Sequence, residues 1–418
     1  MSAYNEIYSS KPIAMNYAED EEKIWMALLN RNGICEIDKK TKTARICKIF
    51  DEEPLDGELL YSHVEKADQK LIFSPCKAKK IAIYNLEDDF MTYIPLEKVE
   101  YRCKQYQGDI KFWNIFRNHS HVYLVGYSYP AIVKICMDSM EVTYITDWVE
   151  EIETYMEDDD NGGYFADGCV CVGDKALLSV SCTNAVLELN LKTESTRLVK
   201  LDVPMEGIGG ISSADGENIW IVGKKGKTNK ACCWNMRTDR IREYSFSDED
   251  EDIFDPFFAP VCTVSKVYFM PISASGIYEI DIDSGKIQRN QTLELLLKRA
   301  GNDSGFWWKV LAPKIENNLL IFLTCGDSRW HRYNVITGEF QSGIIYIEEN
   351  AEDMNQYFDA VYSKLSLQGM IFSERDIPLK YMVNKAIGTE ERRPYTRTDE
   401  LLVGGRIYEQ IRRGIQYE

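Results

Sequence analysis

The sequence predicts an all-β fold made of seven four-stranded antiparallel units, followed by a short α-helical tail. A strand–turn–strand pattern recurs along the chain, at spacings from 45 residues (Asn190 to Asn235) to 54 residues (Cys136 to Asn190). A strongly apolar segment precedes each copy of the pattern. Aromatic residues, which favour strands, make up 12% of the chain. A period of this length is typical of a four-stranded repeat.

The recurring pattern is an alternating apolar strand, a turn residue, a tight polar turn and a second strand. The residues at the turn entry are Asp38, Asn85, Cys136, Asn190, Asn235, Asp281 and Asn334. Six of these seven are Asp or Asn, whose side chains accept hydrogen bonds from the backbone two residues further on and so begin a turn. We therefore expect seven equivalent hairpins.

The segments before the hairpins indicate strands that are covered on both faces. Examples are KIWMALL before Asp38 and NLLIFLT before Asn334, which are apolar at nearly every position. A shorter segment opens each unit, which gives four strands per unit. Sheets of this kind bury both faces when they close around an axis, so residues 1–348 are predicted to form a seven-bladed β-propeller. The alternatives are an open solenoid or two sandwiches, although sandwich strands recur about every 8–12 residues without this longer period.

The repeat ends near Glu349, and residues 349–418 are predicted to form a tail with two short helices. The first has its apolar residues on one helical face, between Leu379 and Ile387, and the second lies within TDELLVGGRIYEQIRRGI. Because these apolar faces must be covered, we expect the tail to dock on the propeller or on a partner.

The charge of the chain excludes two classes of partner. The formal net charge is −18, and neither nucleic acid nor an anionic membrane surface would attract such a chain.

No stretch approaches the roughly 18 apolar residues of a membrane span, and the N-terminal segment lacks the apolar core of a signal peptide. The 12 cysteines form no C-x-x-C pair. We interpret them as reduced thiols and expect a cytoplasmic protein.

On its seven hairpins, six of which have Asp or Asn at the turn entry, the sequence resembles the broad superfamily of seven-bladed β-propellers found in bacterial proteins of unassigned function. The resemblance covers about residues 10–348 and is one of fold. The recurring dipeptides of WD40 repeats, the double glycines of Kelch repeats and the Asp-box of sialidases are not intact in the sequence.

Propellers commonly bind ligands on the face that carries the connections between units, and two features of the sequence fall there. The first is acidity, since carboxylates crowd residues 51–58, 150–160, 248–255 and 348–353. A negative rim formed by these segments would attract a basic partner. We assign the charge of the site to Asp158, Asp159, Glu251 and Asp252. A solvated surface without a binding role is the alternative.

The second feature is a set of aromatic residues where the units begin. We assign stacking roles to Trp113, Tyr164, Phe258 and Trp308, since flat rings beside carboxylates suit sugars or peptide side chains. Packing between units is the alternative role for these rings.

Two functions follow from this site. The first is a non-enzymatic scaffold that binds a protein or peptide partner, most simply a basic one. The second is a propeller that binds or acts on carbohydrate at the mouth of its central channel. The four histidines, the carboxylates and the serines show no catalytic or metal-ligand spacing. The sequence therefore predicts no cofactor and no metal, and it favours a protein that is not an enzyme.

Overall fold

The structure is a computed structural model. It describes residues 13–55, 57–98, 110–156, 163–226, 228–246, 255–299, 310–324, 329–345 and 347–348. All of these lie in one compact unit, Ser10–Glu348. The predicted helices of residues 349–418 lie outside the described residues.

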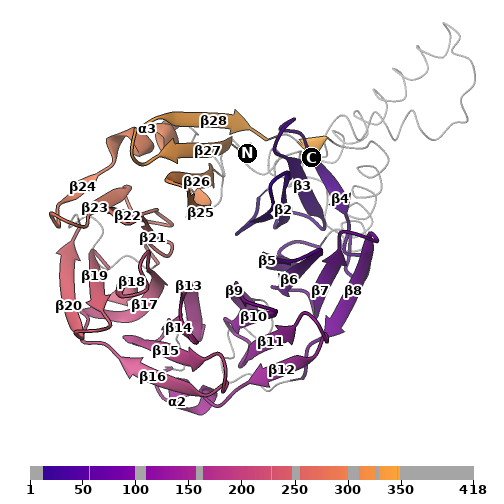
Figure 1. The fold of residues 1–418 in the computed structure, drawn as a ribbon, viewed down its shortest axis with the longest axis horizontal. Coiled ribbons are helices and arrows are strands. Elements are labelled where there is room, and N and C mark those ends of the chain that lie inside the picture. The colour runs from indigo at the N-terminus through magenta and orange to yellow at the C-terminus, as the bar shows by residue number, and fades with distance from the viewer. Residues whose placement is uncertain are drawn as a thin grey trace, which may run out of the picture. The chain divides into compact units, whose positions relative to one another are not determined.

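The described strands form six sheets arranged around an axis, each with its first strands nearest that axis (Figure 1). Four sheets have four strands, one has five and one has eight. The five-stranded sheet has the order β1-β2-β3-β4-β29, formed by β1 (Ala18–Glu19), β2 (Lys23–Ala27), β3 (Ile34–Asp38), β4 (Ala44–Lys48) and β29 (Ile347–Glu348).

Two four-stranded antiparallel sheets follow along the chain. The first is formed by β5 (Tyr61–Ala67), β6 (Lys70–Pro75), β7 (Lys80–Asn85) and β8 (Phe90–Pro95). The second is formed by β9 (Phe112–Asn118), β10 (His121–Gly126), β11 (Ile132–Cys136) and β12 (Val142–Ile145).

The eight-stranded sheet contains two antiparallel four-stranded units in succession. They are β13 (Phe165–Val172), β14 (Lys175–Val180), β15 (Ala185–Asn190) and β16 (Thr196–Lys200), then β17 (Met205–Ser212), β18 (Asn218–Gly226), β19 (Lys230–Asn235) and β20 (Arg240–Ser245). One parallel bridge, Asp167 to Gly210, joins β13 to β17. Gly210 also allows the segment before β21 to approach closely, because a Cβ atom there would lie 2.6 Å from Ala259 Cα.

The last two four-stranded sheets complete the described strands. They consist of β21 (Val261–Cys262), β22 (Lys266–Phe269), β23 (Tyr278–Asp281) and β24 (Ile287–Arg289), then β25 (Val310–Glu316), β26 (Leu319–Thr324), β27 (Arg329–Asn334) and β28 (Phe340–Ile344). The chain is therefore a β-propeller of antiparallel four-stranded blades. Five sheets are separate blades, and the eight-stranded sheet is continuous, so the seven predicted blades are not seen as seven separate sheets.

The predicted hairpins are confirmed. Each turn-entry residue ends the third strand of its four-stranded unit, from Asp38 at the end of β3 to Asn334 at the end of β27. The Asp38 carboxylate accepts from the backbone N–H groups of Lys40 and Thr41 at 2.8 and 2.7 Å. The residue four positions after each turn entry has a positive φ in all seven hairpins, from Lys42 (63°) to Gly338 (72°). The same turn geometry thus recurs with different sequences.

Hydrophobic clusters lie between successive blades. One of them combines Ile72 and Ile81 from the β5–β8 blade with Val122 and Val133 from the β9–β12 blade. All four residues are fully buried. The second strands are buried along nearly their whole length, as the apolar segments predicted. Burial of both faces by neighbouring blades is the main stabilising contribution of this architecture.

The two ends of the described chain meet both within the first sheet and between the first and last sheets. Strand β29 pairs in parallel with β4, with Ile347 opposite Ala44. Lys314 of β25 forms an ion pair with Glu19 of β1. The Lys314 ammonium also lies 3.8 Å from the centroid of the Tyr17 ring. These contacts bring together segments from the two ends of the described chain.

Within the described residues, two short helices interrupt the all-β pattern between blades. Helix α2 (Val149–Glu153) lies between β12 and β13, and α3 (Gln291–Arg299) lies between β24 and β25. The Asn290 side chain accepts from the Leu293 N–H at 3.0 Å and caps α3. Neither helix was predicted from the sequence. Among the described residues, no helix has the length and apolar character needed to cross a membrane.

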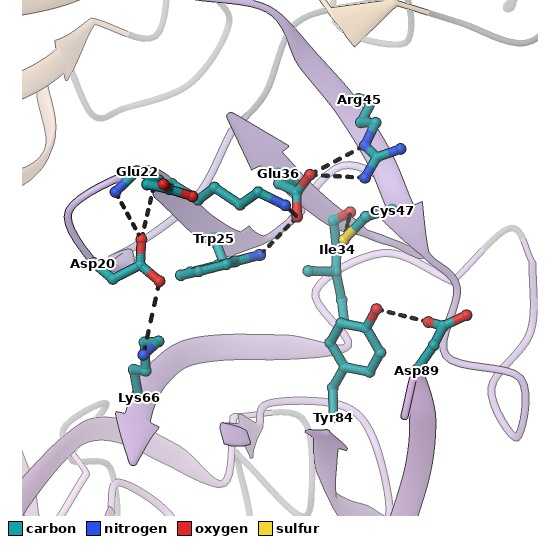
Figure 2. A network of polar contacts seen from close by, with 11 residues as sticks. Asp20, Glu22, Trp25, Ile34, Glu36, Arg45, Cys47, Lys66, Tyr84 and Asp89 are labelled. Atoms are coloured by element: carbon teal, nitrogen blue, oxygen red, sulfur yellow. Dashed lines mark hydrogen bonds and ion pairs between the residues drawn. The ribbon is translucent and has the colours of Figure 1, made fainter. Parts of the chain in front are cut away.

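The same polar arrangement recurs in three of the blades, and we call it the polar ladder: a glutamate on the third strand contacts polar side chains on the second and fourth strands of its own blade. In the first blade, Glu36 of β3 lies between Trp25 of β2 and Arg45 of β4 (Figure 2). Its carboxylate accepts from the Trp25 indole N–H at 3.1 Å and from Arg45 at 2.9 Å. Lys23 at the start of β2 adds a third donor at 3.1 Å.

Glu188 and Glu279 occupy the equivalent position, two residues before Asn190 and Asp281. Glu188 pairs with Lys175 at 2.9 Å and with Arg197 at 3.2 Å. Glu279 pairs with Lys266 at 3.0 Å and accepts from the Gln288 amide at 2.6 Å. A lysine that opens the second strand and a glutamate two residues before the turn entry are the sequence signal of this ladder. These glutamates were not predicted from the sequence.

Candidate functional site

Three of the predicted site residues are described, and they differ in exposure. Trp113, in β9, is half-buried. Tyr164, just before β13, is 1% exposed, and Phe258, before β21, is 4% exposed. The Tyr164 ring packs edge-on against Trp148, and its hydroxyl donates to Glu153 at 2.9 Å. Among these three, Trp113 is therefore the aromatic side chain that can meet a ligand in this structure.

The other predicted site residues lie outside the described residues: Trp308, Asp158, Asp159, Glu251 and Asp252. Their roles in stacking and charge stay predictions.

Trp113 is part of an aromatic group that joins two blades. Its ring centroid lies 6.3 Å from that of His63 in β5 and 5.7 Å from that of Tyr127, which follows β10. The two blades are also linked by the Ser62 hydroxyl, which donates to the Phe112 carbonyl at 2.9 Å. These contacts lie at the end of the blades where β5 and β9 begin, and both strands are close to the axis (Figure 1).

A buried lysine extends this group towards the β17–β20 blade. Lys224 is 2% exposed. Its ammonium lies 5.0 Å from the Tyr127 ring centroid and 3.5 Å from the Tyr127 hydroxyl. An ammonium over a ring face is attracted by the ring quadrupole, more strongly when water is excluded. The backbone N–H of Asp255 donates to the Lys224 carbonyl at 2.8 Å, so Asp255 is held beside this lysine.

Two carboxyl groups complete what we call the axial cluster: His63, Trp113, Tyr127, Asp167, Lys224 and Asp255. Burial raises the pKa of Asp255 above its usual range, Lys224 acts in the opposite direction, and Asp167 adds to the increase. Burial also raises the pKa of Asp167, although the backbone N–H groups of Ala259 and Gly168 donate to its carboxylate at 3.2 and 2.8 Å. For both carboxyls, burial destabilises the ionised form more than the nearby hydrogen-bond donors or Lys224 stabilise it.

His63 adds no positive charge to the axial cluster. Burial lowers the pKa of its imidazole to about 3, so the ring is neutral at physiological pH. Its Nδ1 atom has no hydrogen-bond partner among the described residues. Lys224 is accordingly the cation of the cluster.

The acidic connections are partly neutralised by their own blades. The Asp51 carboxylate accepts from the Tyr93 hydroxyl at 2.7 Å, and Glu52 forms an ion pair with Lys80. Glu150 and Glu151 on helix α2 are exposed. The described part of the predicted rim therefore includes carboxylates that take part in structural contacts and others that face solvent.

In the described part of the chain, no group of three or more His, Cys, Asp or Glu side chains is arranged to hold a metal ion. The described cysteines form no disulfide with one another. Cys169 and Cys171 of β13 are neighbours, with their sulfur atoms 3.8 Å apart.

The fold and the axial cluster define a β-propeller with an aromatic and ionic group near its axis. No protein-family model matches the chain, and no curated protein sequence matches it. Solved structures of the same fold do match it.

A streptogramin B lyase is 15% identical with a TM-score of 0.53, and the match covers 78% of this chain and 93% of that one. A catalytically inactive virginiamycin B lyase from Staphylococcus aureus with quinupristin is 12% identical with a TM-score of 0.54, covering 77% and 94%. PorZ, a surface component of the type-IX secretion system of Porphyromonas gingivalis, is 12% identical with a TM-score of 0.51, covering 82% and 40%. At these identities the likeness shows the propeller fold alone.

Proposed function

We propose that this protein is a non-enzymatic binding scaffold, and that its axial cluster takes a cationic side chain from a protein or peptide partner. The observation that carries the proposal is the pair of desolvated carboxyl groups, Asp167 and Asp255, in a cluster that is linked through Lys224 and Tyr127 to the half-buried Trp113. A second cation placed beside these carboxyls would stabilise their ionised forms, as Lys224 already does for Asp255.

The aromatic residues of the cluster support the same kind of ligand. Tyr127 already holds the Lys224 ammonium against its ring at 5.0 Å. Trp113 lies next to it and is the stronger type of ring for a cation. A guanidinium or ammonium group of a partner would find a partly exposed indole on one side and carboxyl groups nearby.

The exposed carboxylates of Glu150 and Glu151 would assist this binding from a distance. Carboxylates on the connections around a site attract a basic partner and raise its rate of association. Asp158 and Asp159 belong to the same connection, Glu251 and Asp252 belong to the connection between β20 and β21, and all four have the same proposed role.

The proposal includes seven blades. The eight-stranded sheet contains two four-stranded meanders, β13–β16 and β17–β20, that share the single bridge from Asp167 to Gly210. Counted as two blades, these meanders and the five separate sheets give the seven units that the hairpin spacing predicts. Asp167 then lies where two blades meet, close to the axis.

A direct test uses a blocked peptide of alternating glycine and arginine and a matched peptide with citrulline in place of arginine. We expect the arginine peptide to bind in calorimetry and the citrulline peptide to bind much more weakly. Because Asp167 and Asp255 have raised pKa values, the affinity should increase as the pH rises through those values and the carboxyls ionise.

Two variants locate the binding. Asp255→Asn should weaken binding about tenfold or more, the usual effect of losing a charged partner. Asp138→Asn makes the same change in net charge in the exposed turn between β11 and β12 and should have little effect. Equal losses in the two variants would mean that only overall charge matters. Binding of a neutral oligosaccharide that is lost in Trp113→Leu would instead support the carbohydrate alternative.

A further inference from the structure

A pocket lies between the β17–β20 blade and the β21–β24 blade, away from the axial cluster. It has a volume of about 430 Å³, which is within the range of small-molecule sites. Trp220, Tyr244, Arg240 and Arg242 are among its lining residues. The pocket therefore combines aromatic walls with two cationic side chains.

The polar ladder explains why a positive charge lines this pocket. In the first blade, Trp25, Glu36 and Arg45 stand opposite one another on neighbouring strands. In the β17–β20 blade the same register places Trp220 opposite Cys233, and Cys233 opposite Arg242. This blade keeps the tryptophan and the arginine of the ladder, but a cysteine replaces the glutamate that both of them contact in the first blade.

The Cys233 thiol does not take over the role of that carboxylate. Burial raises its pKa to about 11, although Arg242 acts in the opposite direction, so the thiol is neutral at physiological pH. The polar contact of Arg242 is with the Tyr244 hydroxyl, which is itself neutral at that pH. Within the described residues, neither Arg240 nor Arg242 forms an ion pair.

Asp215, the acidic residue in the lining of the pocket, has partners other than the two arginines. The Asp215 carboxylate accepts from the backbone N–H groups of Glu217 and Asn218, both at 2.8 Å. It also accepts from the Ser213 hydroxyl at 3.1 Å and from the Asn218 amide at 2.8 Å. These four hydrogen bonds hold Asp215 in its own turn, and they leave both arginines of the pocket available to an anion.

The rest of the pocket suits an apolar group. The rings of Trp220 and Tyr244 lie 5.2 Å apart. Val264, on the turn between β21 and β22, is 84% exposed, and Ile282 lies nearby in the lining. An exposed valine next to aromatic side chains gains from contact with an apolar ligand.

We propose that this pocket binds a small carboxylate that carries an apolar or aromatic group. Its carboxylate takes the place that the Glu36 carboxylate has in the first blade and meets the Arg242 guanidinium, with Arg240 beside it. Its apolar part packs against Trp220, Tyr244 and Val264. This site is independent of the cation-binding function proposed for the axial cluster.

The test uses phenylacetate and its uncharged analogue phenylacetamide as probes, with NMR or calorimetry on the full chain. We expect phenylacetate to bind in the low millimolar range or more tightly, as small ligands of this size do. Phenylacetamide should bind about tenfold more weakly or worse, since it cannot form a charge-assisted pair with arginine. Equal binding of the two probes, or no binding of phenylacetate, would overturn the proposal.

Three variants place the probe in the pocket. Arg242→Gln should weaken phenylacetate binding about tenfold or more. Cys233→Glu should abolish it, because the new carboxylate restores the glutamate of the ladder and occupies Arg242 internally. Arg45→Gln is the matched control in the first blade, where Glu36 already pairs with the arginine, and it should leave binding unchanged.

The variants also give results that would reject the site. Unchanged phenylacetate binding in Arg242→Gln would do so, and so would an equal loss in Arg45→Gln. A second pocket of about 290 Å³ is lined by Lys42, Trp330 and Arg332. Binding that is lost in Arg332→Gln but kept in Arg242→Gln would place the probe there and contradict the assignment.

Discussion

Two glutamates of the polar ladder allow the contribution of one hydrogen bond to the free energy of unfolding to be measured. Glu36 and Glu188 occupy equivalent positions, and their side chains are 10% and 14% exposed. Both accept from a lysine and an arginine on the neighbouring strands. They differ in one donor: the buried Trp25 indole N–H contacts Glu36, and Leu177 stands at that position opposite Glu188. We predict that Glu36→Ala destabilises the protein more than Glu188→Ala.

The expected difference follows from the exposure of the donors. Lys175 and Arg197 are 45% and 68% exposed, so water solvates them when Glu188 is removed, and the cost is about 1 kcal/mol or less. Lys23 and Arg45 are 36% and 64% exposed and behave in the same way. Trp25 is only 2% exposed. Its N–H would stay buried without an acceptor, which costs about 1–3 kcal/mol. Glu36→Ala should therefore lower the free energy of unfolding by about 2–3 kcal/mol.

The assay is urea unfolding of both variants and the parent chain, followed by tryptophan fluorescence and circular dichroism. Glu36→Gln is the informative third variant, because its amide oxygen still accepts from the indole while the charge is lost. It should destabilise by less than Glu36→Ala. Equal destabilisation by Glu36→Ala and Glu188→Ala would refute the assignment of the extra stability to the indole hydrogen bond.

The same comparison has a pH dependence of known sign. Burial raises the pKa of Glu36, but the hydrogen bonds from Lys23 and Arg45 outweigh this, and the net pKa lies below its usual range. A carboxyl with a lowered pKa in the folded state stabilises the protein above the pKa of the unfolded chain, about 4.3. That stability is lost as the pH falls through the folded-state pKa. The difference between the parent chain and Glu36→Gln should therefore be full near pH 7 and shrink in acid.

Two further predictions concern the hairpins and the thiols. Gly338→Ala should lower the free energy of unfolding by about 1–2 kcal/mol, because Gly338 has a φ of +72°. Gly343→Ala is the control: a Cβ atom there also meets no atom within 4 Å, but Gly343 lacks a positive φ, so this variant should be less destabilised. Equal destabilisation of the two variants would contradict the backbone explanation. Cys171 is exposed, and a hydrogen bond with Cys169 lowers its pKa. Iodoacetamide should therefore modify Cys171 first among the described cysteines; mass spectrometry that finds another of these modified faster would contradict this.

The hairpins and the second strands could be predicted from the sequence because their causes are local. Asp38 and Asn334 form their turns with backbone groups two and three residues away. The second strands are apolar on both faces, which the composition shows directly. Helix α3 was also readable, since Asn290 caps it three residues before Leu293. Its cap is a local signal, although the helix was not predicted from the sequence.

The axial cluster could not be predicted in the same way. Tyr127 and Lys224 are 97 residues apart in the chain, and their contact depends on how three blades pack around the axis. The eight-stranded sheet likewise depends on the approach of β13 to β17, which brings Asp167 opposite Gly210. Neither of these two long-range contacts is determined by a local sequence pattern.

The sequence by itself determined that this protein repeats one hairpin seven times and covers its second strands on both faces, because turns and apolar strands depend on neighbours in the chain. Only the tertiary structure decided that Tyr164 and Phe258 are buried while Trp113 is half-exposed. Alternation along a strand assigns a side chain to one of two faces, and in this fold a neighbouring blade covers either face. The packing of those blades therefore decides which ring can meet a ligand.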